Sequence, residues 1–225
     1  MKYYALLLMV FSFALATASF AADIVVTGSG VVSTDPDMAR VSMGVDVLKD
    51  TAAQAQDANA RTMDKIIAAL RSAGVKNEDM QTSSYSLREE RSYQDRVPKT
   101  VGYRCGNQVT VKLNDLKKVG KIIDTGTLAG ANSVNSVWFY RKDDSEQKKL
   151  ALKMAYKEAL EKAEALAQAA GKSIGGLNQI MEAGAQTIEI QPIRAMNMMK
   201  AEAETPILAG QVEVRAEITA SFLVN

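Results

Sequence analysis

The chain has 225 residues, with 27 Lys and Arg against 26 Asp and Glu, a net charge of +1, and no histidine. A chain this close to neutral, without a run of basic residues, lacks the electrostatic footprint of a nucleic-acid-binding protein. The missing histidine excludes Ser-His and Cys-His nucleophile pairs and the commonest zinc and copper ligand. We therefore expect a protein that is not an enzyme and carries no cofactor.

The N-terminal residues predict export. An uncharged stretch over residues 3–22 ends in small side chains at the positions that a signal peptidase reads. We predict a signal peptide over residues 1–21 with cleavage after Ala21, and a periplasmic mature chain, residues 22–225, that forms a single domain. The alternative is an uncleaved membrane anchor, because the stretch is long enough to span a bilayer. We expect no membrane span in the mature chain.

The first half of the mature chain predicts two strands, a helix and a hairpin. Residues 23–32 form a strand that contains two glycines, and a second strand over about 39–48 alternates apolar and polar residues. A helix follows, with Thr51 as a capping residue at its start and a glycine after its end. The hairpin that comes next has arms of about residues 79–91 and 100–113, joined by a charged link.

The middle of the chain completes a known order of elements. A second helix begins at Asn114 or Asp115 and ends near Gly130, and a strand follows over residues 133–141. That strand is apolar on both faces, which predicts either a central strand or an interface strand. From about residue 40 to 141 the order is strand, helix, strand, strand, helix, strand, which is the ferredoxin-like βαββαβ order.

The last third of the chain adds a long helix and C-terminal strands. The helix runs from about 145 to 170, is capped by Asp143 or Asp144, and repeats alanine at every fourth position, which allows close packing on a neighbour. Strands follow near 176–190 and at the C-terminus. The inward residues of the last strand are Val212, Val214, Ala216, Ile218, Ala220 and Phe222. We predict an α+β fold with helices packed on a mixed, largely antiparallel sheet.

The only cysteine, Cys105, lies in the second arm of the hairpin. Strand alternation places Cys105 on the same face as Val109 and Val111, while Arg104 points to the other face. This pattern favours a buried structural cysteine, which behaves as a small apolar residue. The alternative is a redox thiol, whose pKa a positive charge on the same face would lower.

Charged residues of both signs gather at the tip of the predicted hairpin. Mixed signs suit a self-complementary contact between identical subunits. We predict an oligomer contact here, with an exposed hairpin on a monomer as the alternative. The candidate contact residues are Arg88, Glu89, Glu90, Arg91, Asp95 and Arg96.

A methionine-rich segment near residue 197 offers the remaining chemistry. Met196, Met198 and Met199 make it a weak candidate for Cu(I) binding or for reaction with oxidants, because thioethers do both. Methionines also make adaptable apolar contacts with a partner. These interpretations remain open on the residues alone.

Four stretches resemble one family. "ADIVVTGSGVVSTDPDMARVSMGVDV", "GYRCGNQVTVKLNDLKKVGKIIDTGTLAGANSVNSVWF", "AYKEALEKAEALAQAAGKSIG" and "PILAGQVEVRAEITASFLV" are similar to bacterial SIMPL-domain proteins, although Cys105 stands where the family usually carries another small residue. The resemblance implies an α+β fold, a periplasmic or surface location, a part in oxidative-stress defence or as a periplasmic immunogenic protein, and large homo-oligomers. It implies no catalytic residues.

These observations lead to one functional hypothesis and one alternative. We expect an exported, non-enzymatic protein of the cell envelope that contributes to oxidative-stress tolerance by homo-oligomeric assembly or by binding an envelope protein. The alternative is a redox- or metal-handling periplasmic protein that uses the methionine-rich segment.

Overall fold

The computed structural model describes residues 22–94, 97–188 and 205–225. Its strands form two sheets, each with antiparallel pairing throughout the described residues. The terminal sheet has the order β1-β7-β6 and consists of β1 (Asp23–Thr34), β7 (Val212–Val224) and β6 (Ile174–Ile188). The central sheet has the order β3-β4-β2-β5 and consists of β3 (Met80–Gln94), β4 (Val97–Leu113), β2 (Met38–Lys49) and β5 (Ser133–Tyr140).

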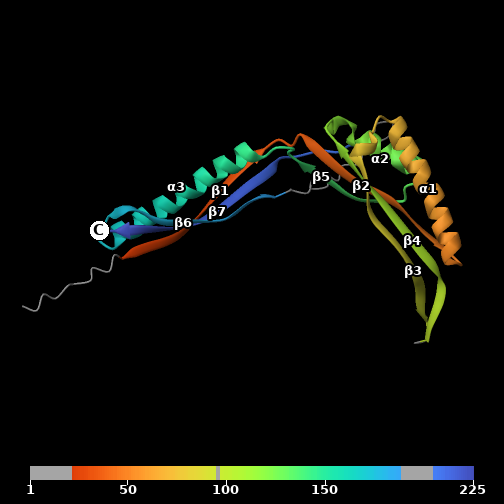
Figure 1. Cartoon of the computed structure of the whole chain (residues 1–225), viewed down its shortest axis with the longest axis horizontal. Helices are drawn as coiled ribbons and strands as arrows, with labels where there is room; N and C mark the ends of the chain where they lie inside the picture. The colour runs from red at the N-terminus through yellow and green to blue at the C-terminus, as the bar shows by residue number, and fades with distance from the viewer. Residues whose placement is uncertain (1–21, 95–96, 189–204) are drawn as a thin grey trace, which may run out of the picture.

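Helices cover one face of each sheet (Figure 1). Helix α3 (Ser145–Ala169) packs on the terminal sheet, whereas α1 (Ala52–Ser72) and α2 (Val119–Leu128) pack on the central sheet. The two sheets meet at an angle and form an arch with the helices on its outer side, and the β3–β4 hairpin projects past α1. Among the described residues, no helix is long and apolar enough to span a membrane.

The predicted α+β class and the βαββαβ order are confirmed. The strands divide into two sheets, and the central sheet holds all four strands of the βαββαβ unit. The chain enters the terminal sheet at β1, builds the central sheet, and returns through α3, β6 and β7. Each sheet has its own core, because the buried apolar residues of the two sheets form separate clusters.

Two details of the strands differ from the sequence-based expectation. The first hairpin arm ends at Gln94 and the second begins at Val97, so both arms are longer than predicted. The charged side chains of a projecting hairpin can stay in water while the backbone of its strands pairs. Strand β5 lies at an edge of the central sheet and pairs with β2 alone among the described strands, so it is not a central strand. The other expectation for β5, an interface strand, stays a prediction.

Side chains cap the helix starts much as the sequence suggested. The Gln54 backbone N–H donates to Thr51 Oγ1 at 3.3 Å at the start of α1. At α3, Asp144 occupies the N-cap position, but it is Asp143 Oδ1 that accepts from the Ser145 backbone N–H, at 3.0 Å. The hydrogen bonds from Ser145 lower the pKa of Asp143, because they stabilise the ionised carboxylate.

The junction between the two sheets is held by polar contacts between separate connections of the chain. Arg141 Nη1, after β5, donates to the Asp35 carbonyl oxygen at 3.0 Å, and the Lys142 backbone N–H donates to Asp37 Oδ1 at 2.7 Å. The segment that leads into β7 is fixed on α2, where the Thr205 backbone N–H donates to Asp124 Oδ2 at 3.0 Å. These contacts fix the connections that pass between the two sheets.

The alanine repeat of α3 lets this helix lie unusually close to β1. Every alanine of the repeat is fully buried, and the set is Ala151, Ala155, Ala159, Ala163 and Ala167. A Cβ atom added at Gly28 of β1 would lie 2.0 Å from the Ala155 carbonyl oxygen, and one at Gly30 would lie 2.0 Å from that of Ala151. The helix backbone therefore occupies the space that side chains at these two strand positions would need.

We predict that Gly28→Ala lowers the free energy of unfolding by about 1–3 kcal/mol, because the new methyl group must push α3 off the sheet. The control is Gly106→Ala in β4, whose added Cβ would lie 3.1 Å from the Ser86 hydroxyl and 3.5 Å from Asp46 Oδ2, both at side-chain ends that can move. Urea denaturation of both variants measures the difference. Equal stability of the two variants would contradict the close packing of α3 on β1.

Candidate functional site: the charged hairpin

The β3–β4 hairpin positions most of the predicted contact residues. Its strands pair from Met80 opposite Val111 to Gln94 opposite Val97, with register irregularities near Ser84 and between Glu90 and Arg91. The four predicted contact residues from 88 to 91 therefore lie within β3, short of the tip to which the sequence assigned them. Six residues that the sequence analysis named lie outside the described residues: Ala21, Asp95, Arg96, Met196, Met198 and Met199.

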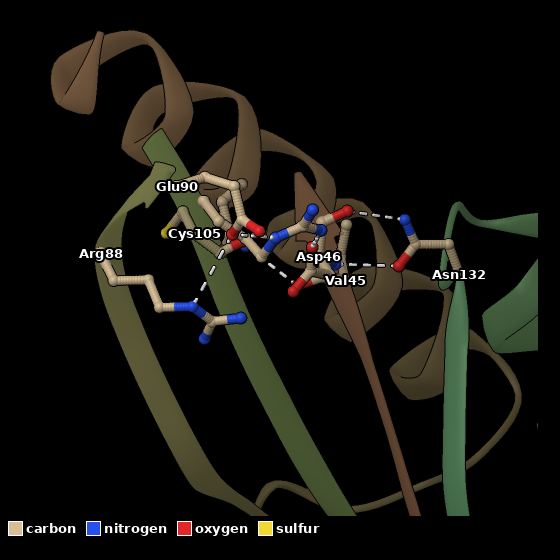
Figure 2. Close-up of polar contacts among 8 residues, drawn as sticks. Val45, Asp46, Arg88, Glu90, Cys105 and Asn132 are labelled. Carbon is tan, nitrogen blue, oxygen red and sulfur yellow. Dashed lines mark hydrogen bonds and ion pairs between the residues drawn. The ribbon is translucent and has the colours of Figure 1, made fainter. Parts of the chain in front are cut away.

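One ion-pair cluster lies on the face of the central sheet that faces away from the helices. Arg104 of β4 donates from Nη1 to Asp46 Oδ1 at 2.6 Å and from Nε to Glu90 Oε2 at 2.9 Å (Figure 2). Arg88 Nε lies 3.9 Å from the same Glu90 oxygen. Glu90 and Asp46 raise the pKa of Arg104, because both carboxylates stabilise its positive form. Two cations and two carboxylates thus form a neutral group across β3, β4 and β2.

The other two predicted residues in β3 form a separate pair. Arg91 Nη2 donates to Glu89 Oε2 at 2.7 Å, and the Thr100 hydroxyl donates to the other carboxylate oxygen of Glu89. The bond from Arg91, followed by that from Thr100, lowers the pKa of Glu89. Because Glu89 and Glu90 are consecutive in a strand, their side chains point to opposite faces. The structure therefore divides the predicted residues between the two faces of the hairpin.

Two asparagines hold β2 and β4 in place around the Arg104 cluster. The Asp46 backbone N–H donates to Asn132 Oδ1 and Asn132 Nδ2 donates to the Asp46 carbonyl oxygen, both at 2.8 Å, so this side chain pairs with β2 as a strand would (Figure 2). On the helix side, Asn59 of α1 is buried and its Nδ2 donates to the carbonyl oxygens of Val45 and Cys105 at 3.0 and 2.9 Å. The backbone beside the ion pairs is therefore fixed from both sides.

The cysteine is fully buried, as its place in the strand pattern predicted. The Cys105 thiol donates to the Tyr85 hydroxyl oxygen, with Sγ 3.7 Å from that oxygen. Arg104, the neighbouring cation in the sequence, is bound to Asp46 and Glu90 on the other face of the sheet. The absence of a redox role for Cys105 stays a prediction.

The two carboxylates of the Arg104 cluster share one partner. One guanidinium holds two carboxylates in ion pairs, so neither carboxylate is set apart in a cleft as acid–base catalysis requires. In the part of the chain that the structure describes, no group of three or more His, Cys, Asp or Glu residues is placed to hold a metal ion. The hairpin is a pair of strands that carries ion pairs on both of its faces.

Residues 24–222 match one family model, "SIMPL: Protein of unknown function (DUF541)". The chain belongs to the SIMPL family. It is 30% identical to the 26 kDa periplasmic immunogenic protein of Brucella melitensis over 214 residues, which covers 91% of this chain and 85% of that protein. It is also 27% identical to the uncharacterized protein YggE of Escherichia coli K12 over 195 residues, covering 87% and 78% of the two chains. The resemblance stated from the residues is thereby confirmed.

The sequence pattern predicted some features of the Arg104 cluster in this SIMPL chain but not its contacts. Alternation put Arg104 and Asp46 on the polar faces of their strands, but it does not give the register that sets Asp46 opposite Gly106, next to Arg104. Nothing in the sequence indicated that the Asn132 side chain pairs with β2, because an asparagine before a strand usually indicates a turn. Its role depends on β5 stopping short of Asp46, which only the folded sheet reveals.

For the buried thiol, we predict that native protein reacts with a thiol reagent far more slowly than protein in urea, because Cys105 has no exposed surface. The measurement is the rate of colour release from a disulfide reagent in the two conditions. Cys105→Ala should retain the fold and any oxidant tolerance. Fast labelling of the native protein, or loss of tolerance in this variant, would show that the cysteine has an active role.

For the ion-pair cluster, we predict that Arg104→Gln lowers the free energy of unfolding by about 1–2 kcal/mol, because it leaves Asp46 and Glu90 without their shared partner. The control is Arg61→Gln, which removes only an exposed i,i+4 pair with Asp57 on α1 and should cost about 0.5 kcal/mol or less. Urea denaturation at low salt compares them. An effect of Arg104→Gln no larger than the control would show that the cluster does not stabilise the hairpin.

Proposed function

We propose that this SIMPL protein is an exported, non-enzymatic protein of the cell envelope that contributes to oxidative-stress tolerance through homo-oligomeric assembly. The signal-peptide pattern of residues 1–21 supports export, and the relatives from Brucella are named periplasmic. The stress role rests on the resemblance to SIMPL-domain proteins. The observation that carries the assembly proposal is the projecting hairpin, whose outer strand β3 pairs on one side only among the described strands.

An edge strand is a template for pairing with another chain unless something covers it. On β1, one of the two edge strands of the terminal sheet, two side chains of α3 bind backbone groups. Glu158 accepts from the Ser29 backbone N–H, and Lys162 Nζ donates to the Thr27 carbonyl oxygen at 2.9 Å. The bond from Ser29, followed by that from Lys162, lowers the pKa of Glu158 to about 2, so this carboxylate stays charged at an acidic pH where an ordinary glutamate is protonated.

Strand β3 also exposes large apolar side chains, as β1 does at Val25. Tyr85 is 52% exposed and Leu87 39% exposed, on the same face of the sheet as the thiol of Cys105. Val101, in the other arm, is 46% exposed. Exposed large apolar residues on a projecting element are typical of an interaction site. Their burial against a second copy of the hairpin would favour assembly.

The charges of the hairpin suit a contact between identical surfaces. A two-fold contact places each residue against a copy of its own surface, so a surface with one sign of charge would repel itself. The Arg104 cluster is neutral as a group, and Glu89 pairs with Arg91 on the other face. Neither face of the hairpin therefore carries a repulsive excess of one charge in this region.

The test is the mass of the mature protein, residues 22–225, by light scattering at micromolar concentrations. We predict an oligomer, and we predict that Leu87→Glu shifts it towards the monomer because a charge would enter the apolar contact. The control is Leu128→Glu on α2, at a residue that is 89% exposed and lies away from the hairpin. Circular dichroism confirms that both variants fold.

Two outcomes would contradict the proposal. A monomeric wild-type protein over the whole concentration range rejects assembly, and equal masses for the Leu87→Glu and Leu128→Glu variants reject the hairpin as the contact.

The stress role is tested in cells that lack the gene. Wild-type protein and Leu128→Glu should restore growth in hydrogen peroxide, whereas Leu87→Glu should not. Equal peroxide sensitivity with and without the gene rejects a role in tolerance.

A further inference from the structure

The face of the central sheet that no described helix covers carries a second group of residues at the end nearest the junction, far along β2 from the Arg104 cluster. Arg40 of β2 lies between Trp138 of β5 and Lys112 of β4 in the strand register. The guanidinium carbon of Arg40 lies 5.2 Å from the centre of the Tyr140 ring. The neighbours of Arg40 in β2 are fully buried on the helix side, so Arg40 and its partners point to the open side of the sheet.

The charges at this end of the sheet are not balanced. In the described part of the chain, neither Arg40 nor Lys112 forms an ion pair, whereas the two arginines at the other end of the same face both lie beside carboxylates. The carboxylate just before β2, that of Asp37, accepts from the Lys142 backbone N–H at 2.7 Å and lies 3.7 Å from Arg141 Nη2. Two adjacent cations are thus left to attract an anion.

The next positions along the strands carry short hydroxyl side chains. Ser42 of β2 lies opposite Thr110 of β4 and Ser136 of β5, and all three are partly exposed. Further along the strands, Gly44 of β2 lies opposite Gln108 of β4, so neither of these positions carries a charged side chain. An aromatic ring, two cations and a row of hydroxyl groups are therefore arranged side by side on an open surface.

We propose that this face binds an anionic carbohydrate chain. Arg40 and Lys112 bind its carboxylate or phosphate groups, since charge-assisted hydrogen bonds from guanidinium and ammonium groups are the strong ones. Trp138 packs its ring against a sugar, and Ser42 and Thr110 bond to sugar hydroxyls. An acidic protein segment fits less well, because an extended peptide binds along a free strand edge and this site lies on the face of the sheet.

The chain provides its own reporter for this site. Trp138 is the only tryptophan in the sequence, so tryptophan fluorescence reports on this face alone. The probe is an alginate oligosaccharide, whose sugars carry carboxylates, added to the mature protein at low salt. We expect a saturable change in fluorescence that weakens as salt is added. Maltohexaose, which has no charge, should cause a far smaller change.

Substitutions test whether Arg40 and Lys112 are needed for the fluorescence change. Arg40→Gln and Lys112→Gln should each weaken alginate binding about tenfold, because each removes one charge-assisted bond. The matched control is Lys153→Gln, at an exposed position on α3, which should bind as the wild type does. Circular dichroism checks that each variant is folded, and the fluorescence of Trp138 checks that its surroundings are unchanged before titration.

Three results would overturn the proposal. The first is no fluorescence response to alginate, and the second is equal binding by the wild type and both cation variants. The third is tighter binding of polyglutamate than of alginate at matched charge, which would assign the face to an acidic protein segment. The inference does not depend on assembly, because a monomeric variant such as Leu87→Glu should bind alginate equally well.

Discussion

Each sheet of this protein can bury only one of its faces. In β2 the apolar residues Ala39, Val41 and Met43 alternate with polar ones, and in β7 the buried positions from Val212 to Phe222 follow the same alternation. Helices therefore pack on one side of each sheet, and the junction sets these sides on the outside of an arch. Among the described residues, no helix covers the inner face of either sheet.

The open face of the central sheet has two ends with different physical properties. Near the hairpin, Arg104 and Arg88 balance the charges of Asp46 and Glu90, so this end of the face is neutral as a group. Near the junction, Arg40 and Lys112 have no carboxylate partner in the described residues, and that end suits an anion. Two of the sheet edges also differ, because side chains of α3 bind part of the β1 edge, whereas no described strand pairs with the outer edge of β3. The proposed assembly and the proposed ligand binding therefore use separate surfaces.

Patterns within one element predicted much of this fold, whereas relations between elements did not follow from them. The alternation of β7 and the alanine repeat of α3 identified buried faces correctly, since both depend on local periodicity alone. The charged residues 88–91 were assigned to the hairpin tip, because exposed charges on a projecting strand pair look the same in sequence as those of a loop. The edge position of β5, the pairing of Asn132 with Asp46 and the partners of Arg104 depend on strand order and register, which side-chain periodicity does not encode.

We propose that copies of this chain meet through the outer edge of β3. Hydrogen–deuterium exchange of the mature protein, measured at nanomolar and at high micromolar concentration, tests it directly. We predict that the amides of β3 exchange more slowly at the higher concentration, while those of β1, whose edge α3 partly covers, exchange at the same rate in both. Exchange in β3 that does not depend on concentration, while another segment becomes protected, would contradict the account.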